Sequence, residues 1–255
     1  MSNVDVTIVL PMYNENERIL QCVQAVENAV LSITKSFRII IAEDGSNDGT
    51  ERLAMEIAKS RPNIIHLHAD QRLGRGAALK NALINYQAEV TVYMDADLAA
   101  DLSHLSDLIK MTRERGGIVI GSRYVKGAQV NNRPIVRTIA SVAYNNLIRI
   151  LFNDGTRDHQ CGLKAFDKKL IDDVLEEVQA TGWFWDTEII IRSQKKGYPV
   201  IEMPIRWLEP RSRRESKVKV LSDSYELGKS LLQLWWKLNF RKTLPMVKRK
   251  IEDRG

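Results

Sequence analysis

The chain has 255 residues, of which 44% are hydrophobic and 27% charged. This balance is ordinary for a globular protein and excludes a fibrous or disordered chain. The formal net charge of +6 favours anionic partners, such as acidic lipids or phosphorylated substrates. Cys22 and Cys161, the two cysteines, match no zinc-binding spacing, so we expect reduced thiols in an intracellular compartment.

The sequence shows neither a signal-peptide pattern nor a clear membrane-spanning stretch. The first residues lack the basic and then apolar order of a signal peptide. No stretch holds the roughly 18 uninterrupted apolar residues of a spanning helix. The most apolar stretch, residues 135–152, is interrupted by Arg137, Asn145, Asn146 and Arg149. We therefore expect any membrane contact to be peripheral, with no transmembrane helix.

The first half of the chain alternates two kinds of segment. Short apolar and β-branched runs, which predict strands, cover residues 4–10, 37–42, 63–68, 90–94 and 117–120. Segments with helical periodicity cover residues 15–31, 48–59, 77–86 and 103–115. This alternation predicts an α/β fold, with a mostly parallel, Rossmann-like sheet flanked by helices on both faces.

The second half is less regular. Helices are predicted over residues 134–152 and 186–196, and a strand over 200–207. A basic run at 211–219 precedes an amphipathic helix at 222–241, whose apolar stripe is Leu227, Leu231, Leu234, Trp235 and Leu238. The stripe, with Trp236, suits either a membrane interface or packing against the main domain. We expect a main domain over residues 1–220 and an interfacial helix with a basic tail over 221–255.

Polar clusters follow four of the predicted strands, at residues 11–16, 43–50, 72–76 and 95–97. In an open parallel sheet, ligands bind beyond the carboxyl ends of the strands. Four clusters at the same edge predict one shared crevice.

Asp95 and Asp97 form the sharpest pair in this crevice. Two carboxylates at the end of an apolar strand can share Mg²⁺ or Mn²⁺, which would neutralise a diphosphate leaving group. A solvated turn is the alternative for an isolated Asp-x-Asp. Asp44 suits either recognition of a nucleobase or ribose, or a helix-capping turn.

Candidate anion ligands lie further along the chain. Arg137, Ser141, Asn145 and Arg149 recur at intervals of four, so they share one face of the predicted helix. That face would line an anion channel or simply face solvent. Arg123 ends a predicted strand near the crevice. Arg211 and Lys217 belong to the basic run, which would either fold over the crevice or stay solvated.

Several other chemistries are disfavoured. The loop at 72–76 lacks the Lys-Ser/Thr of a P-loop, and no Gly-x-Gly-x-x-Gly or Gly-x-Ser-x-Gly occurs. No nucleic-acid reading motif accompanies the basic charge. The histidines, His66, His68, His104 and His159, suggest no ligand set by their spacing.

The motifs together resemble the family 2 glycosyltransferases of GT-A fold, and within them the dolichyl-phosphate mannose and glucose synthases. The matching segments are VLPMYNE (9–15), EDGSNDGT (43–50), GRGAA (74–78), DAD (95–97), GSRY (121–124), RDHQCGLKAF (157–166), WDTE (185–188) and SKV (216–218). The resemblance implies transfer of a hexose, glucose or mannose, from UDP-glucose or GDP-mannose to dolichyl or polyprenyl phosphate. It implies inversion, dependence on Mg²⁺ or Mn²⁺, and peripheral attachment to the cytoplasmic face of a membrane.

Residue roles follow from the same resemblance. Donor binding is implied for Pro11, Tyr13, Glu15, Asp44, Gly74, Asp95, Ala96 and Asp97. Acceptor-phosphate binding is implied for Arg123, Arg137, Ser141, Arg211 and Lys217. Asp95, Asp97 and Arg123 are the implied catalytic residues, and Asp95 and Asp97 the implied metal ligands. Ala99 departs from the mannose synthases, which often have a metal-assisting glutamine there; Ala99 and residues 160–162 look more like the glucose type.

Two rival hypotheses remain. One is a family 2 enzyme that acts on a hydroxyl acceptor, with Asp186 as the base that removes its proton. A phosphate acceptor needs no such base, because it is already largely dianionic near neutral pH. The other rival is a non-catalytic nucleotide-sugar-binding or membrane-adaptor protein, which has little need of a metal at the diphosphate.

Overall fold

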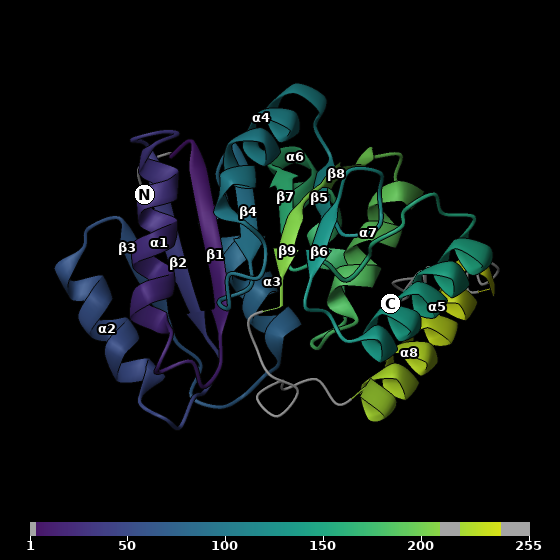
Figure 1. Cartoon of the computed structure of the whole chain (residues 1–255), viewed down its shortest axis with the longest axis horizontal. Coiled ribbons are helices and arrows are strands. Elements are labelled where there is room, and N and C mark those ends of the chain that lie inside the picture. The colour runs from purple at the N-terminus through teal and green to yellow at the C-terminus, as the bar shows by residue number, and fades with distance from the viewer. Residues whose placement is uncertain (1–3, 210–219, 241–255) are drawn as a thin grey trace, which may run out of the picture.

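The computed structural model describes residues 4–209 and 220–240 (Figure 1). Its main sheet has seven strands in the order β3-β2-β1-β4-β7-β5-β8. These strands are β1 (Val6–Met12), β2 (Phe37–Glu43), β3 (Ile64–Leu67), β4 (Val90–Met94), β5 (Ile118–Ser122), β7 (Leu163–Asp167) and β8 (Val200–Pro204). All pairings are parallel except those of β7, which runs antiparallel to both β4 and β5. The predicted α/β fold with a mostly parallel sheet is therefore confirmed.

Helices cover both faces of the sheet. On one face α1 (Ile19–Leu31) contacts both α2 (Thr50–Ser60) and α4 (Leu105–Arg115), which follows the short helix η1 (Leu102–His104). The second layer holds α3 (Arg75–Tyr86), α6 (Lys168–Val174) with the short helix η2 (Leu175–Glu177), and α7 (Trp185–Lys195). Because both faces are covered, β1, β2, β4 and β5 read as nearly continuous buried apolar runs.

Sequence patterning missed β7, which lies in the middle of the main sheet. It pairs in register with β4, from Val90 opposite Asp167 to Met94 opposite Leu163. This pairing sets Gly162 beside Asp95, at the edge where the polar clusters meet. A two-stranded parallel sheet of β6 (Gln129–Asn131) and β9 (Arg206–Leu208) completes the strands described.

Two long helices, α5 (Ile135–Phe152) and α8 (Val220–Phe240), lie side by side at one end of the molecule (Figure 1). Leu231 and Leu234 of α8 are buried against Ile148 of α5 and Ile191 of α7. Leu227 and Leu238 pack against the same cluster. Four residues of the predicted apolar stripe of α8 therefore pack against the main domain. The expected membrane contact of this helix stays a prediction. The expected domain boundary at residue 220 adjoins the undescribed segment and stays a prediction.

Candidate active site

A cavity of about 280 Å³ opens beyond the carboxyl ends of the central strands. Of the residues that the sequence predicted for donor and acceptor sites, it is lined by Pro11, Tyr13, Glu15, Asp44, Asp95, Ala96, Asp97, Arg123, Arg137 and Ser141. Gly74 is not in the lining, but its backbone N–H donates to Asp44 Oδ2 at 2.9 Å. Arg211 and Lys217 lie outside the described residues. The polar clusters predicted to share a crevice thus do so.

Arg75 organises the carboxylate end of the cavity. Its Nη2 donates to Asp95 Oδ1 at 2.7 Å, and its Nη1 donates to Asp186 Oδ2 at 2.6 Å. The guanidinium also lies over the ring of Trp183, with 5.1 Å to the ring centroid. Asp97, on the turn after β4, accepts the backbone N–H of Ala99. Both aspartates line the cavity, so two carboxylates are available to a hard divalent cation.

Asp186 lies behind this carboxylate end, with only 2% of its side chain exposed. Besides Arg75, it binds Lys164 Nζ at 2.6 Å and accepts a hydrogen bond from the hydroxyl of Tyr93. Burial raises the pKa of Asp186 to about 6, although Arg75 opposes the shift. Burial likewise lowers the pKa of Lys164 to about 7. Since its oxygens are engaged by three side chains and it is absent from the cavity lining, Asp186 is poorly placed to take a proton from an acceptor.

Gly162 precedes β7 and accepts the backbone N–H of Asp95 through its carbonyl oxygen, at 2.9 Å. A Cβ at this position would lie 1.8 Å from Asp95 Oδ2. Only glycine therefore lets the loop before β7 approach this carboxylate so closely.

The predicted nucleoside end of the cavity is built from the loops after β1, β2 and β3. Asp44 is buried, and its Oδ1 accepts the backbone N–H of Leu73 at 2.7 Å. With the Gly74 contact, this joins the end of β2 to the loop that begins α3. Gly45 has φ of +67°, and an added Cβ would lie 2.6 Å from the backbone nitrogen of Arg72. The Arg72 guanidinium stacks over Tyr13, 4.1 Å from its ring centroid, so the two form one wall.

Arg123 occupies the opposite end, where Asp158 holds it. Arg123 Nε and Nη2 donate to the two oxygens of Asp158 at 2.8 and 2.7 Å. The Arg123 charge lowers the pKa of Asp158 against the effect of burial. The guanidinium also lies 4.8 Å from the ring centroid of Trp207. A bidentate buried pair of this kind fixes the arginine rigidly at the cavity wall.

Arg133 is the main cavity residue that sequence reasoning missed. It lines the same end as Arg123, and its Nη2 donates to Ser141 Oγ at 2.8 Å. Its Nε and Nη1 are buried and have no hydrogen-bond partner among the described residues. Arg137 also faces this end, where its Nη1 binds Glu209 Oε1 at 2.7 Å. The signal that could have found Arg133 was its place just before α5, four residues before Arg137 and eight before Ser141.

The rest of the predicted polar stripe on α5 serves other contacts. Asn145 is buried, and its Oδ1 lies 2.8 Å from the ring Nδ1 of His159. His159 Nε2 lies 2.6 Å from Asp154 Oδ2. These contacts hold the loop that carries Asp158 against α5. Arg149 is exposed and is not in the cavity lining, so the stripe contributes Arg137 and Ser141 alone to the cavity.

Comparison with known proteins gives the class. Residues 7–175 match the model of glycosyl transferase family 2, and the chain belongs to this family. It is 37% identical to glycosyltransferase AglD of Haloferax volcanii over 98% of this chain, and spans 39% of that protein. It is 31% identical to polyprenol monophosphomannose synthase of Mycolicibacterium smegmatis, over 85% of this chain and 81% of that protein. Identity to dolichyl-phosphate beta-glucosyltransferase ALG5C of Trichomonas vaginalis is 29%, over 98% of this chain and 76% of that protein.

Solved structures of glycosyltransferases share the fold. Glucosyl-3-phosphoglycerate synthase from Mycobacterium tuberculosis, with Mn²⁺, UDP and glucosyl-3-phosphoglycerate, has a TM-score of 0.65 at 18% identity, over 91% of this chain and 80% of that chain. Mannosyltransferase PcManGT from Pyrobaculum calidifontis, with GDP-Man and Mn²⁺, has a TM-score of 0.54 at 19% identity, over 84% and 59%. The GT-A-like architecture predicted from the motifs is thereby confirmed.

Proposed function

We propose that this chain transfers a hexose, glucose or mannose, from a nucleotide-diphosphate sugar to polyprenyl (dolichyl) phosphate, with inversion at the anomeric carbon. The relatives named above include enzymes whose names specify dolichyl phosphate or a polyprenol monophosphate. UDP-glucose and GDP-mannose are the candidate donors. The residue roles implied by the motifs are part of the same proposal.

The observation that carries the proposal is that Nε and Nη1 of Arg133 are buried without a hydrogen-bond partner among the described residues. A buried donor without a partner costs roughly 1–3 kcal/mol, more when it is charged. An acceptor phosphate beside Ser141 would supply oxygens to Nε and Nη1 and remove that cost. Arg133 shares its cavity with Asp95 and Asp97, so the phosphate and the donor diphosphate would meet in one space.

The division of charge in the cavity supports a direct displacement. Asp95 and Asp97 would hold Mg²⁺ or Mn²⁺, and their oxygen-only donor set fits such a hard cation. When bound, the ion supplies positive charge to the leaving diphosphate. Arg123, Arg133 and Arg137 would hold the acceptor phosphate with one oxygen directed at the anomeric carbon. Because that phosphate oxygen is already ionised, the transfer needs no general base. The engagement of Asp186 by Arg75, Tyr93 and Lys164 is therefore compatible with this mechanism.

An exposed apolar surface beside the cavity suits a lipid acceptor. On α5, Ile135, Ile139 and Ile150 are 73%, 63% and 79% exposed, and Trp236 of α8 is 60% exposed. Exposed apolar patches of this kind mark interaction sites. Within the described residues, α5 is the helix whose length and hydropathy would allow a membrane span. Because α5 also supplies Arg137 and Ser141 to the cavity, we propose that it lies at a membrane surface as a peripheral contact.

A transfer assay tests this function. Purified protein is incubated with short polyprenyl phosphate, Mg²⁺ or Mn²⁺, and radiolabelled UDP-glucose or GDP-mannose in parallel. We expect a lipid-phosphate hexose from one donor, lost on metal chelation and in Asp97→Ala. A folded, nucleotide-binding protein that forms no lipid product from either donor would overturn the proposal.

A further inference from the structure

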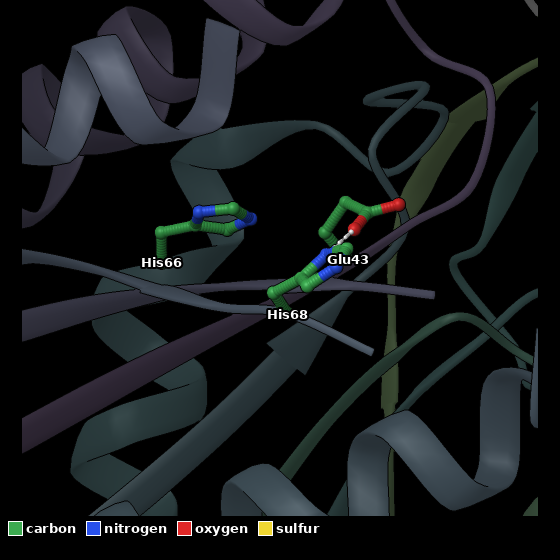
Figure 2. Close-up of side chains that lie close together, drawn as sticks. All are labelled: Glu43, His66 and His68. Atoms are coloured by element: carbon green, nitrogen blue, oxygen red, sulfur yellow. Dashed lines mark hydrogen bonds and ion pairs between the residues drawn. The ribbon is translucent and has the colours of Figure 1, made fainter. Parts of the chain in front are cut away.

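We propose that Glu43, His66 and His68 form a second metal site, separate from the Asp95/Asp97 pair, which binds a transition-metal dication such as Zn²⁺ (Figure 2). The ligands would be two imidazole nitrogens and one carboxylate oxygen. The proposal of this site does not depend on the transfer reaction proposed above.

The sheet itself brings these three side chains together. Ala42 of β2 pairs with Leu67 of β3, so Glu43 and His68 stand opposite each other one residue further on. His66 lies two residues before His68, and alternate residues of a strand point to the same face. The histidine spacing alone did not indicate a ligand set, because the third member comes from the neighbouring strand. Since β3 is an edge strand, the cluster lies at the rim of the sheet.

The atoms are close enough to share an ion. One candidate ligand atom from each residue lies within 4.8 Å of the other two. Glu43 Oε2 and His68 Nδ1 are 2.6 Å apart, and Figure 2 shows this contact as a dashed line. The His66 ring edge is turned toward the same pair, and its buried Nε2 has no hydrogen-bond partner in the part of the chain that the structure describes. An entering cation would replace the Glu43–His68 hydrogen bond and give His66 the partner it lacks.

The donor chemistry distinguishes this site from the one at the cavity. Imidazole nitrogen suits Zn²⁺ and similar metals, whereas an all-carboxylate pair suits Mg²⁺ or Mn²⁺. Two histidines and one glutamate are a known protein ligand set for zinc, with a fourth position left to water or another ligand. Further negative charge is at hand, since Glu51 Oε1 and Asp70 Oδ1 lie 3.8 and 3.6 Å from His68 Nε2. Such charge raises the local concentration of cations.

Glu43 also ties this site to the nucleotide end of the cavity. Its side chain is fully buried, and its Oε1 accepts the backbone N–H of Ser46. Ser46 Oγ in turn accepts the backbone N–H of Asn14, at 3.0 Å. A cation on Glu43 would therefore bind the carboxylate that holds the turn next to Asp44.

A binding measurement on the full chain tests this site. Metal-free protein without a polyhistidine tag is titrated with Zn²⁺ by calorimetry in excess Mg²⁺, and with Co²⁺ by visible absorption. The variants are His66→Asn and His68→Asn, whose side chains are not fully buried, and Asp97→Asn serves as the control for the cavity site.

We expect one Zn²⁺ per chain in the wild type and in Asp97→Asn. Each histidine variant should weaken Zn²⁺ binding at least about tenfold, since even the loss of an outer-shell partner costs this much. A Co²⁺ spectrum with nitrogen ligation should be lost in the same two variants. Zn²⁺ binding that is unchanged in both histidine variants, that is abolished in Asp97→Asn, or that is absent from the wild type would overturn the proposal. None of these results bears on hexose transfer, which is measured separately.

Discussion

Arg75 and Asp95 form a two-point contact at the cavity wall, with Nη2 at 2.7 Å and Nε at 3.2 Å from the same carboxylate oxygen. Arg75 also holds Asp186, so its guanidinium joins a proposed metal ligand to a buried carboxylate. The two carboxylates that flank Arg75 thus differ in position: Asp95 lines the cavity, whereas Asp186 is buried behind it.

This relationship predicts the behaviour of Asp186→Asn. Loss of a general base typically costs about 10²–10⁴-fold in rate. If Asp186 only positions Arg75, the amide retains one acceptor oxygen, and kcat should fall by less than about tenfold. Steady-state kinetics with a saturating lipid acceptor measures this, and circular dichroism checks the fold. A loss above a hundredfold in a folded variant would favour the rival hydroxyl-acceptor hypothesis.

Gly162→Ala should damage the carboxylate site with little change in fold. The new Cβ would lie 1.8 Å from Asp95 Oδ2, so the carboxylate must move. A displacement of about 1 Å at a reacting centre costs on the order of a hundredfold in rate, and we expect kcat to fall by that factor. Gly155→Ala is the matched control, because its Cβ would meet nothing within 4 Å. Equal activity of the two variants would contradict the geometry.

Arg133→Gln should act on the acceptor alone. A hydrogen bond to a charged group contributes about 1.5–3 kcal/mol, so KM for polyprenyl phosphate should rise about tenfold or more. The KM for the nucleotide-sugar should stay within about twofold, since Arg133 lies at the opposite end from Asp44. Arg149→Gln, an exposed position on α5, the helix that follows Arg133, is the control and should change neither constant. An equal rise in both KM values for Arg133→Gln would contradict the proposed role of Arg133 in binding the acceptor.

The double variant Ile139→Glu/Ile150→Glu should bind membranes more weakly. Each large apolar side chain contributes roughly 1.5–3 kcal/mol when fully buried, so the partition coefficient should fall by more than about tenfold. Cosedimentation with vesicles of mixed acidic and neutral phospholipid measures it. Met55→Glu/Ile84→Glu places the same charges at exposed apolar positions on α2 and α3. If the two double variants weaken vesicle binding equally, α5 is not the membrane-binding surface.

Asp154 should make the free energy of unfolding depend on pH in the acid range. Burial alone would raise its pKa, but the hydrogen bond and charge of His159, with hydrogen bonds from Gln194 and the Thr156 backbone, lower it to about 2. A lowered acid pKa contributes stability that is complete above the unfolded pKa, near 3.8, and is lost as the pH falls toward 2. Urea unfolding of wild type and Asp154→Asn at about pH 5 and about pH 3 should show the stability difference shrinking at the lower pH. A difference independent of pH would show that the Asp154 charge contributes nothing.

Sequence patterning predicted β1 to β4 because each of these strands is a separate apolar run followed by a helix. It located β4 at residues 90–94, as observed. It missed β7, whose five residues include Lys164 and end in Asp167. The side chain of Lys164 is completely buried, where it contacts Tyr93 and Asp186. A charged residue interrupts the apolar pattern that predicts a buried strand, so local patterning did not identify β7.

The site was predictable to the extent that motifs mark strand ends. Ten of the predicted residues line the cavity, because carboxyl ends of parallel strands share one edge. Arg133 was missed because its spacing from Arg137 is a weak signal alone, and its two nitrogen atoms without a partner among the described residues are visible only in the packing. The pairing of Glu43 with two histidines was missed because it depends on the register of β2 and β3.

The most direct test of the proposed transfer compares two acceptors that differ only in the phosphate. The initial rate of hexose transfer is measured with a short polyprenyl phosphate and with the corresponding polyprenol, under the same donor and metal. With arginines at the acceptor end and Asp186 engaged by three side chains, we expect transfer to the phosphate, an anomerically inverted product, and no detectable transfer to the alcohol. Comparable rates with the two acceptors, or transfer to the alcohol alone, would contradict the account.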